Sequence, residues 1–142
     1  PMTARTVVST ENAPAAIGPY SQGIVAGGML FCSGQLGLDP ATKALVAGGV
    51  EEQTRQTLKN LRAVLDAGGA SLAAVVKTTI YLADMADFKA VNARHGQRFI
   101  TEIPGDRTAR NCLSSGRNAR ESNDSHAHPQ ERCLSTAPHA NA

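Results

Sequence analysis

The chain has 142 residues, of which 42% are apolar and 18% are charged, and its formal net charge is +2. These values are typical of a single globular domain. The net charge is small and the basic residues are scattered along the chain, which argues against nucleic acid as a partner.

Signals for a membrane or an export pathway are not found in the sequence. No apolar stretch approaches the roughly 20 residues of a membrane span, and the first residues do not form a charged segment followed by an apolar one. Cys32, Cys112 and Cys133 lack the CxxC spacing of a zinc site and are odd in number. We therefore expect a cytoplasmic protein with reduced thiols.

The first elements expected are three strands. Residues 5–9 alternate as an edge strand does, and apolar runs follow at residues 20–25 and 30–33. Gly27 and Gly28 separate these two runs, which is typical of a hairpin with a tight glycine turn.

An amphipathic helix is expected next, over residues 50–67. Apolar or small residues recur there at spacings of three and four, which predicts one buried face. Gly68 and Gly69 then end the helix. The residues of the predicted buried stripe are Val50, Thr54, Thr57, Leu58, Leu61, Val64 and Leu65.

Residues 75–82 are rich in β-branched side chains and predict a central strand. Asp84 then caps a second helix, which carries Phe88, Val91 and Phe99 on one side. The order βββαβα, with both helices on one face of a mixed sheet, is an α+β fold.

Two helices cover only part of such a sheet. Val25, Leu30, Leu36 and Ile80 are expected to leave an apolar face exposed, and this favours self-association of the chain.

The chain changes character after Pro104, which predicts a boundary between a core, residues 1–104, and an atypical polar segment, residues 105–142. Leu113 and Leu134 are the only members of the set Val, Ile, Leu, Met, Phe, Trp and Tyr in that segment. A segment of this composition buries too little apolar surface to offset its ordering entropy, which predicts disorder.

Three runs, taken in this order, resemble one family. They are Ile17 to Gln22 (IGPYSQ), Cys32 to Gly37 (CSGQLG) and Val75 to Leu82 (VVKTTIYL). Over about residues 5–104 the chain resembles the RidA family, also called the YjgF family. The resemblance implies a chorismate-mutase-like fold and a homotrimer that closes into a barrel, with its sites in clefts between subunits.

The resemblance also implies an activity, the hydrolysis of 2-iminobutanoate and 2-iminopropanoate to 2-oxo acids and ammonia. A protonated imine is already electrophilic, so binding its carboxylate and orienting one water supply most of what the reaction needs. The implied enzyme therefore requires no cofactor and no metal.

Four of the implied substrate contacts lie within the core segment. By resemblance, Tyr20 lines the cleft, the backbone N–H at Ser33-Gly34 contacts the substrate carboxylate or carbonyl, and Asn92 lies beside the site. The residues alone also allow a packing tyrosine, a glycine at a β-bulge and a structural asparagine.

Arg110 is the implied catalytic residue. The run Thr108 to Cys112 (TARNC) resembles the family's Pro-Ala-Arg motif, whose guanidinium holds the substrate carboxylate by two hydrogen bonds, and Cys112 matches a cysteine of some members. A rival alignment matches Pro104 to the motif's proline and puts Asp106 at the arginine position. A solvated arginine in a polar segment is the third interpretation.

The family's terminal strand carries a glutamate that positions the attacking water, and no such segment is recognisable here. Glu121 and Glu131 have polar neighbours and receive no role. The segment is therefore divergent, disordered or read from a shifted frame. The hypothesis of a shifted frame comes from residues 112–117. With suitable codons, their coding sequence read one nucleotide later can encode a run that resembles the family's.

Two further functions stay open beside the deaminase. One is a catalytically impaired trimeric binding or scaffold protein on the same fold. The other is an endoribonuclease or translation inhibitor, for which the sequence offers neither an aromatic RNA-binding strand nor a basic stripe.

Overall fold

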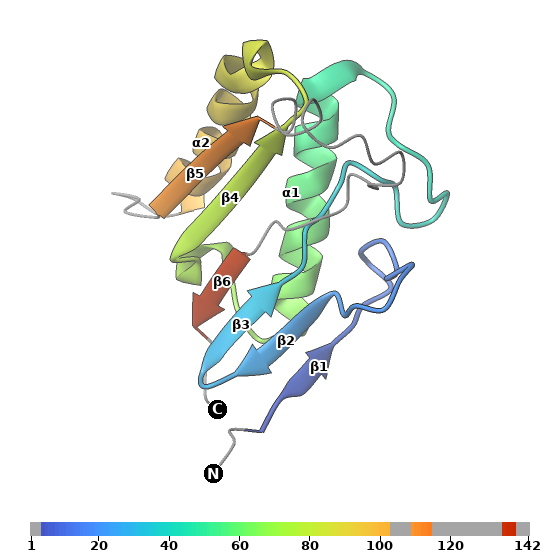
Figure 1. Cartoon of the computed structure of the whole chain (residues 1–142), viewed down its shortest axis with the longest axis vertical. Coiled ribbons are helices and arrows are strands. Elements are labelled where there is room, and N and C mark those ends of the chain that lie inside the picture. Colours follow the sequence, from blue (N-terminus) through green and yellow to red (C-terminus); the bar gives the residue numbers. More distant parts are fainter. Residues whose placement is uncertain (1–3, 103–108, 115–134, 139–142) are drawn as a thin grey trace, which may run out of the picture.

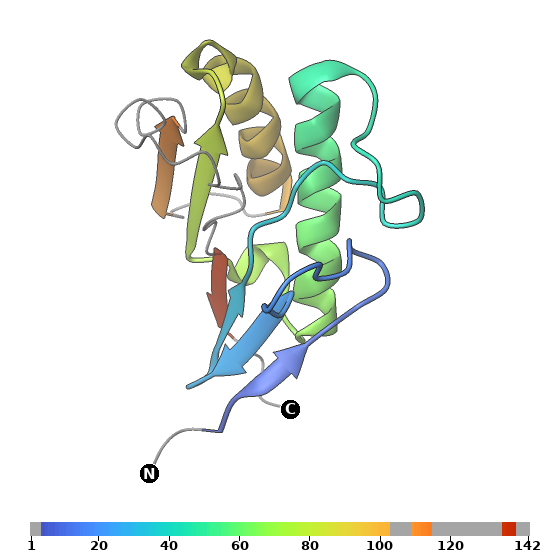
Figure 2. The same cartoon turned by 45° about the vertical axis from the view of Figure 1, so that its right-hand side comes forward.

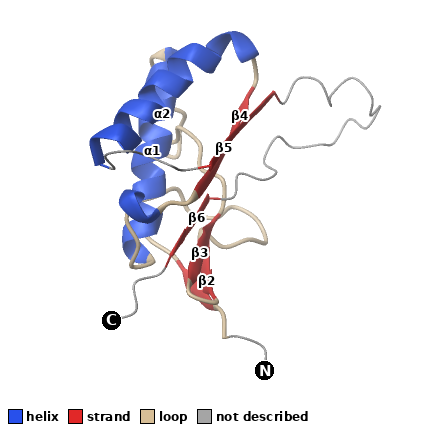
Figure 3. Cartoon of the chain, turned by 90° about the vertical axis from the view of Figure 1, so that its left-hand side faces the viewer, coloured by secondary structure: helices blue, strands red, loops and turns tan. Residues whose placement is uncertain are grey.

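The computed structural model describes residues 4–102, 109–114 and 135–138, with side chains up to His95. Six strands form one sheet in the order β1-β2-β3-β6-β4-β5. Helices α1 and α2 cover one face of this sheet (Figures 1, 2 and 3). The α+β class and the βββαβα order of the core are confirmed. The elements are β1 (Thr6–Val8), β2 (Gly23–Ala26), β3 (Met29–Cys32), α1 (Gly49–Ala67), β4 (Lys77–Leu82), α2 (Phe88–Glu102), β5 (Ala109–Ser114) and β6 (Ser135–Pro138), with short 3-10 turns η1 (Leu72–Ala74) and η2 (Met85–Asp87).

The predicted glycine hairpin joins β2 to β3. Ala26 pairs with Met29, and the two residues between them, Gly27 and Gly28, have φ angles of 57° and 75°. Both angles lie in the left-handed region, which a two-residue hairpin turn requires and glycine adopts without a steric penalty. β1 then pairs antiparallel with the free edge of β2.

Helix α1 packs its predicted stripe on the sheet. Leu58, Leu61, Val64 and Leu65 are buried, and the helix ends where the Gly68 N–H donates to the carbonyls of Val64 and Leu65, both at 3.0 Å. The central cluster of buried apolar residues comprises Val8, Ala13, Leu30, Cys32, Leu58, Leu61, Val64, Leu65, Leu72 and Val75.

The exposed apolar residues differ in part from the prediction. Leu36 is 48% exposed, as expected, and Ile80 is half-buried. Leu30, in contrast, is fully buried in the core cluster, and Val25 is half-buried against it. Side chains alternate along a strand, so Leu30 and Cys32 point toward α1 and Phe31 points to the opposite face. The exposed large apolar side chains on that outer face include Val7, Phe31 and Tyr81, which are 65%, 40% and 43% exposed.

Asp84 caps a short turn before the second helix, not the helix itself. The Asp84 carboxylate accepts a hydrogen bond from the Ala86 N–H at 2.8 Å, capping η2, which leads directly into α2. Val91 is buried, whereas Phe88 is 41% exposed, since it is the first residue of the helix and lies at the end of the packed layer. The side chain of Phe99 lies outside the described residues.

Two strands come from the segment for which composition predicted no ordered element. β5 runs parallel to β4, and β6 lies between β3 and β4, antiparallel to both (Figure 1). A β-ladder is made by backbone N–H and C=O groups, so polar residues can pair in it without burying apolar side chains. The predicted boundary at residue 104 stays a prediction.

Candidate functional site

Ser33, which directly follows β3, is hydrogen-bonded to the two residues that follow Tyr20, Ser21 and Gln22. The Ser33 hydroxyl donates to the Ser21 carbonyl at 2.5 Å, and the Ser33 N–H donates to the Gln22 carbonyl at 3.0 Å. The residue after Tyr20 is thus fastened to the residue before Gly34. Tyr20 is 44% exposed and Gly34 is exposed, so both face solvent where a ligand can reach them.

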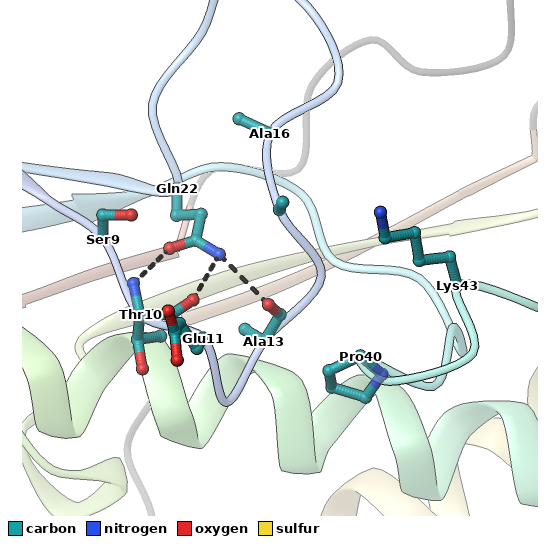
Figure 4. Close-up of a pocket in the computed structure, with 9 residues that line it drawn as sticks. Ser9, Thr10, Glu11, Ala13, Ala16, Gln22, Pro40 and Lys43 are labelled. Atoms are coloured by element: carbon teal, nitrogen blue, oxygen red, sulfur yellow. Dashed lines mark hydrogen bonds between the residues drawn. The ribbon is translucent and has the colours of Figure 1, made fainter.

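The buried side chain of Gln22 holds the chain segment that precedes Tyr20. Gln22 is 3% exposed. Its Oε1 accepts from the Thr10 N–H at 2.6 Å, and its Nε2 donates to the carbonyls of Thr10 at 3.0 Å and Ala13 at 3.3 Å (Figure 4). Its Nε2 also donates to the Pro14 carbonyl at 2.8 Å. The segment before the Tyr20 turn is thereby tied to the start of β2. Sequence reasoning missed this residue, because a polar side chain gives no periodic signal for burial.

A pocket of about 550 Å³ opens beside Gln22 (Figure 4). None of the predicted site residues lines it, so it is separate from the candidate site. Its lining residues are Ser9, Thr10, Glu11, Ala13, Ala15, Ala16, Gln22, Pro40 and Lys43.

Arg110 and Cys112 lie elsewhere, on β5. In the parallel ladder Arg110 is opposite Thr78 and Cys112 is opposite Ile80. Strands β6 and β4 separate β5 from β3. Neighbouring strands lie about 4.8 Å apart, so three spacings put β5 roughly 14 Å from β3. One chain therefore does not bring the Arg110 backbone next to Gly34.

Asn92 is exposed on α2, next to the buried Val91. It thus lies in the helix layer, toward solvent, and not among the packed side chains of the helix. Its predicted place beside a substrate stays a prediction.

The loop after β3 has one charged group with a shifted pKa. The backbone N–H groups of Thr42 and Ala41 each donate to the Asp39 carboxylate at 2.9 Å and hold its pKa below the ordinary value. These bonds close the exposed turn at residues 39–43.

In the described part of the chain, no three His, Cys, Asp or Glu side chains are grouped to hold a metal ion, and no helix is long and apolar enough to cross a membrane.

The sheet with two helices on one face matches solved structures along nearly all of their length. The YjgF gene product of E. coli aligns with a TM-score of 0.76 and 35% identity, over 94% of this chain and 98% of that chain. E. coli TdcF with bound serine aligns with a TM-score of 0.77 and 29% identity, over 95% and 99%. The fold is therefore that of the RidA/YjgF class.

The family model described as Endoribonuclease L-PSP matches residues 10–117, and the chain belongs to this family, that of the RidA proteins. Reactive Intermediate Deaminase A, chloroplastic, from Arabidopsis thaliana is 53% identical over 104 residues, which are 73% of this chain and 56% of that protein. The chain thus spans just over half the length of this relative. The human 2-iminobutanoate/2-iminopropanoate deaminase is 47% identical over 100 residues, 70% of this chain and 73% of that protein.

Proposed function

We propose that this protein hydrolyses 2-iminobutanoate and 2-iminopropanoate to 2-oxo acids and ammonia in the cytoplasm. Relatives with this activity in their names are close in sequence, and one of them, from Salmonella typhimurium, is 46% identical over 110 residues. The observation that carries the proposal is the pair of hydrogen bonds from Ser33 to Ser21 and Gln22. They join two of the family-like runs, residues 17–22 and 32–37, at the solvent-exposed end of β3.

In the proposed mechanism the Gly34 N–H donates to the substrate carboxylate or carbonyl, and Tyr20 forms the wall of the cleft. The Arg110 guanidinium pairs with the carboxylate through two hydrogen bonds, which fix the imine carbon relative to one water. Cys112 and Asn92 lie at the border of this cleft. The bound serine of E. coli TdcF, a small molecule with a carboxylate, is a ligand of the kind this arrangement would hold.

The separation of β3 and β5 supports a site shared between subunits. Since two strands lie between them in one chain, Gly34 of one copy would meet Arg110 of another, and the proposed assembly is a homotrimer. The exposed apolar residues of the outer sheet face, Val7, Phe31 and Tyr81, provide the surface for this contact.

Ammonia release from freshly generated 2-iminobutanoate tests the activity. The purified chain is expected to accelerate release above the uncatalysed rate. A folded trimer without this effect would favour the scaffold function, and cleavage of single-stranded RNA after stringent purification would favour the ribonuclease.

A further inference from the structure

Asn60 is a fully buried polar residue in the middle of α1. Its Nδ2 donates to the Leu36 carbonyl at 2.9 Å and to the Leu38 carbonyl at 2.8 Å, and its Oδ1 accepts from Gln56 Nε2 at 2.8 Å. Both N–H donors of the amide are used on one short loop. Because carbonyls only accept, the amide has a single orientation that fits, with nitrogen toward the loop.

The loop lies on α1 at a point where no side chain fits. A Cβ added to Gly37 would lie 2.7 Å from the Gln53 Cα and 2.8 Å from the Gln53 carbonyl oxygen, both backbone atoms of the helix. The Gly37 carbonyl meanwhile accepts from the Val46 N–H at 2.9 Å. All three carbonyls of residues 36–38 are therefore engaged, two of them by Asn60.

Gly34 lies between this loop and the corner at Ser33. On its N-terminal side, Ser33 is bonded to Ser21 and Gln22, and on its C-terminal side, Leu36 is bonded to Asn60. The bonds of the Ser33 N–H and of the Leu36 carbonyl each fix a backbone group within two residues of Gly34. Only Gly34 and Gln35 stand between the two attachments.

We propose that Asn60 is a positioning residue that fixes residues 34–38 in the conformation that presents the Gly34 N–H to the 2-imino acid. The identity of the substrate in this proposal rests on the proposed function. The effect of Asn60 on the loop rests only on the hydrogen bonds described above. Asn60 does not touch the ligand. It acts by holding the loop backbone, since loss of its amide leaves the carbonyls of Leu36 and Leu38 without their buried donors.

Two variants remove the attachment in different ways. Asn60→Leu keeps a side chain of similar size but has no donor for the two carbonyls. Gly37→Ala leaves Asn60 in place and pushes the loop off α1, because the new methyl group meets helix backbone. The matched control is Val64→Ala, a buried residue of the same helix whose Cγ1 lies against Gly23 of β2, away from the loop.

Two amides report on this loop, because the Val46 N–H donates to the Gly37 carbonyl and the Asp39 N–H donates to the Ala44 carbonyl. Their hydrogen exchange is measured at a temperature well below unfolding. Asn60→Leu and Gly37→Ala are expected to exchange these two amides at least about tenfold faster than the wild type, whereas Val64→Ala lowers the melting temperature without a local effect there. Unchanged exchange of both amides in folded Asn60→Leu would overturn the proposal.

Kinetics with 2-iminobutanoate and binding of 2-oxobutanoate, the unreactive product, test the consequence for the site. Both loop variants are expected to raise KM and the product Kd roughly tenfold with a smaller change in kcat, and the control is expected to leave KM and Kd unchanged. Faster exchange with unchanged KM and Kd would remove the positioning role. A wild-type chain that neither reacts nor binds the product would refute the proposed function, and the exchange data would still decide whether Asn60 holds the loop.

Discussion

In the proposed mechanism, recognition of the substrate carboxylate depends on Arg110. If Arg110 holds the substrate carboxylate in a partly dry cleft, Arg110→Ala removes a charge-assisted contact worth roughly 2 to 4 kcal/mol and lowers kcat/KM by roughly 30- to 1000-fold. Arg110→Lys restores only part of this, because a point charge cannot reproduce the planar fork. Steady-state deaminase kinetics measure the effect.

Arg117→Ala is the control for that substitution, since Arg117 lies in the same segment without the Ala-Arg-x-Cys context. It is expected to leave kcat/KM within about twofold of the wild type. Equal activity of wild type and Arg110→Ala would mean that the alignment of Thr108 to Cys112 with the family motif is wrong.

Thr78 carries a buried hydroxyl that has no hydrogen-bond partner within the described part of the chain, and its side chain is 3% exposed. An unpaired buried hydroxyl costs free energy, so Thr78→Val, which keeps the shape, is expected to raise the free energy of unfolding by about 1 kcal/mol. Urea denaturation measures the change.

Thr57→Val is the matched control, because the Thr57 hydroxyl donates to the Gln53 carbonyl at 2.8 Å. Its removal is expected to leave stability unchanged or to lower it slightly. A Thr78→Val variant less stable than the wild type would show that the hydroxyl has a partner in the folded protein.

The glycine turn between β2 and β3 allows a test of how much the hairpin depends on glycine. At both Gly27 and Gly28 an added Cβ would meet no atom within 4 Å, yet both φ angles are positive. Gly27→Ala and Gly28→Ala are therefore each expected to lower the free energy of unfolding by about 1 kcal/mol through backbone strain alone. Thermal or urea unfolding measures this cost.

Gly18→Ala is the control for the turn. The nearest atom to its added Cβ would be the Tyr20 Cδ1 at 3.5 Å, an ordinary van der Waals contact, and its φ is not in the left-handed region. This substitution is expected to leave stability within about 0.5 kcal/mol of the wild type. An equal loss in all three variants would rule out strain at the turn as the cause.

Sequence patterns predicted the elements whose signals are local. The Gly27-Gly28 turn and the apolar stripe of α1 each depend on residues close together in the chain, and the structure confirms both. Asp84 also forms the predicted kind of cap, but on η2, the turn that leads into α2. β5 and β6 were missed because their pairing partners are distant in sequence and their own side chains are polar. Backbone pairing leaves no trace in composition.

For the candidate site, the resemblance named Tyr20, Ser33 and Gly34. The structure bonds Ser33 to Ser21, the residue after Tyr20, and the roles of the three residues toward a substrate stay predictions. Gln22 and Asn60, which hold the surrounding loops, were missed, because a buried amide is identified by the carbonyls it binds and not by its neighbours in sequence. The roles of Arg110, Cys112 and Asn92 stay predictions.

The outer face of the sheet is the proposed contact between subunits. Tyr81 lies on the outer sheet face, opposite the helices, and is 43% exposed. If this face packs on another copy, Tyr81→Glu buries a charge in the contact and is expected to convert a trimer into a monomer at micromolar concentration. Sedimentation equilibrium measures the mass, and Lys89→Glu, an exposed change on α2, is expected to leave the trimer intact.

A stable wild-type monomer under the same conditions would contradict the trimer and, with it, the shared site. A Tyr81→Glu trimer would instead place the contact on another surface of the molecule.

The position of β6 allows a second test at this scale. Since Ser135–Pro138 lie between β3 and β4, the amides that pair with these strands are expected to exchange slowly with solvent. Exchange measured by mass spectrometry, with peptide masses covering residues 105–142, also establishes which sequence forms the strand. Fast exchange throughout 135–137 would favour the disordered alternative for this segment, and peptide masses that do not fit the amino-acid sequence would favour the shifted frame.

The central place of β6 also sets an order of events during synthesis. β1 to β5 leave the ribosome before β6 does, so the edges of β3 and β4 that it will join stay unpaired in the meantime. At roughly 5–20 residues per second, the stretch between β5 and β6 takes on the order of seconds to make. Open strand edges are templates for pairing with other chains. The protein would therefore be most prone to aggregation during synthesis, when several unfinished chains lie close together on one messenger RNA.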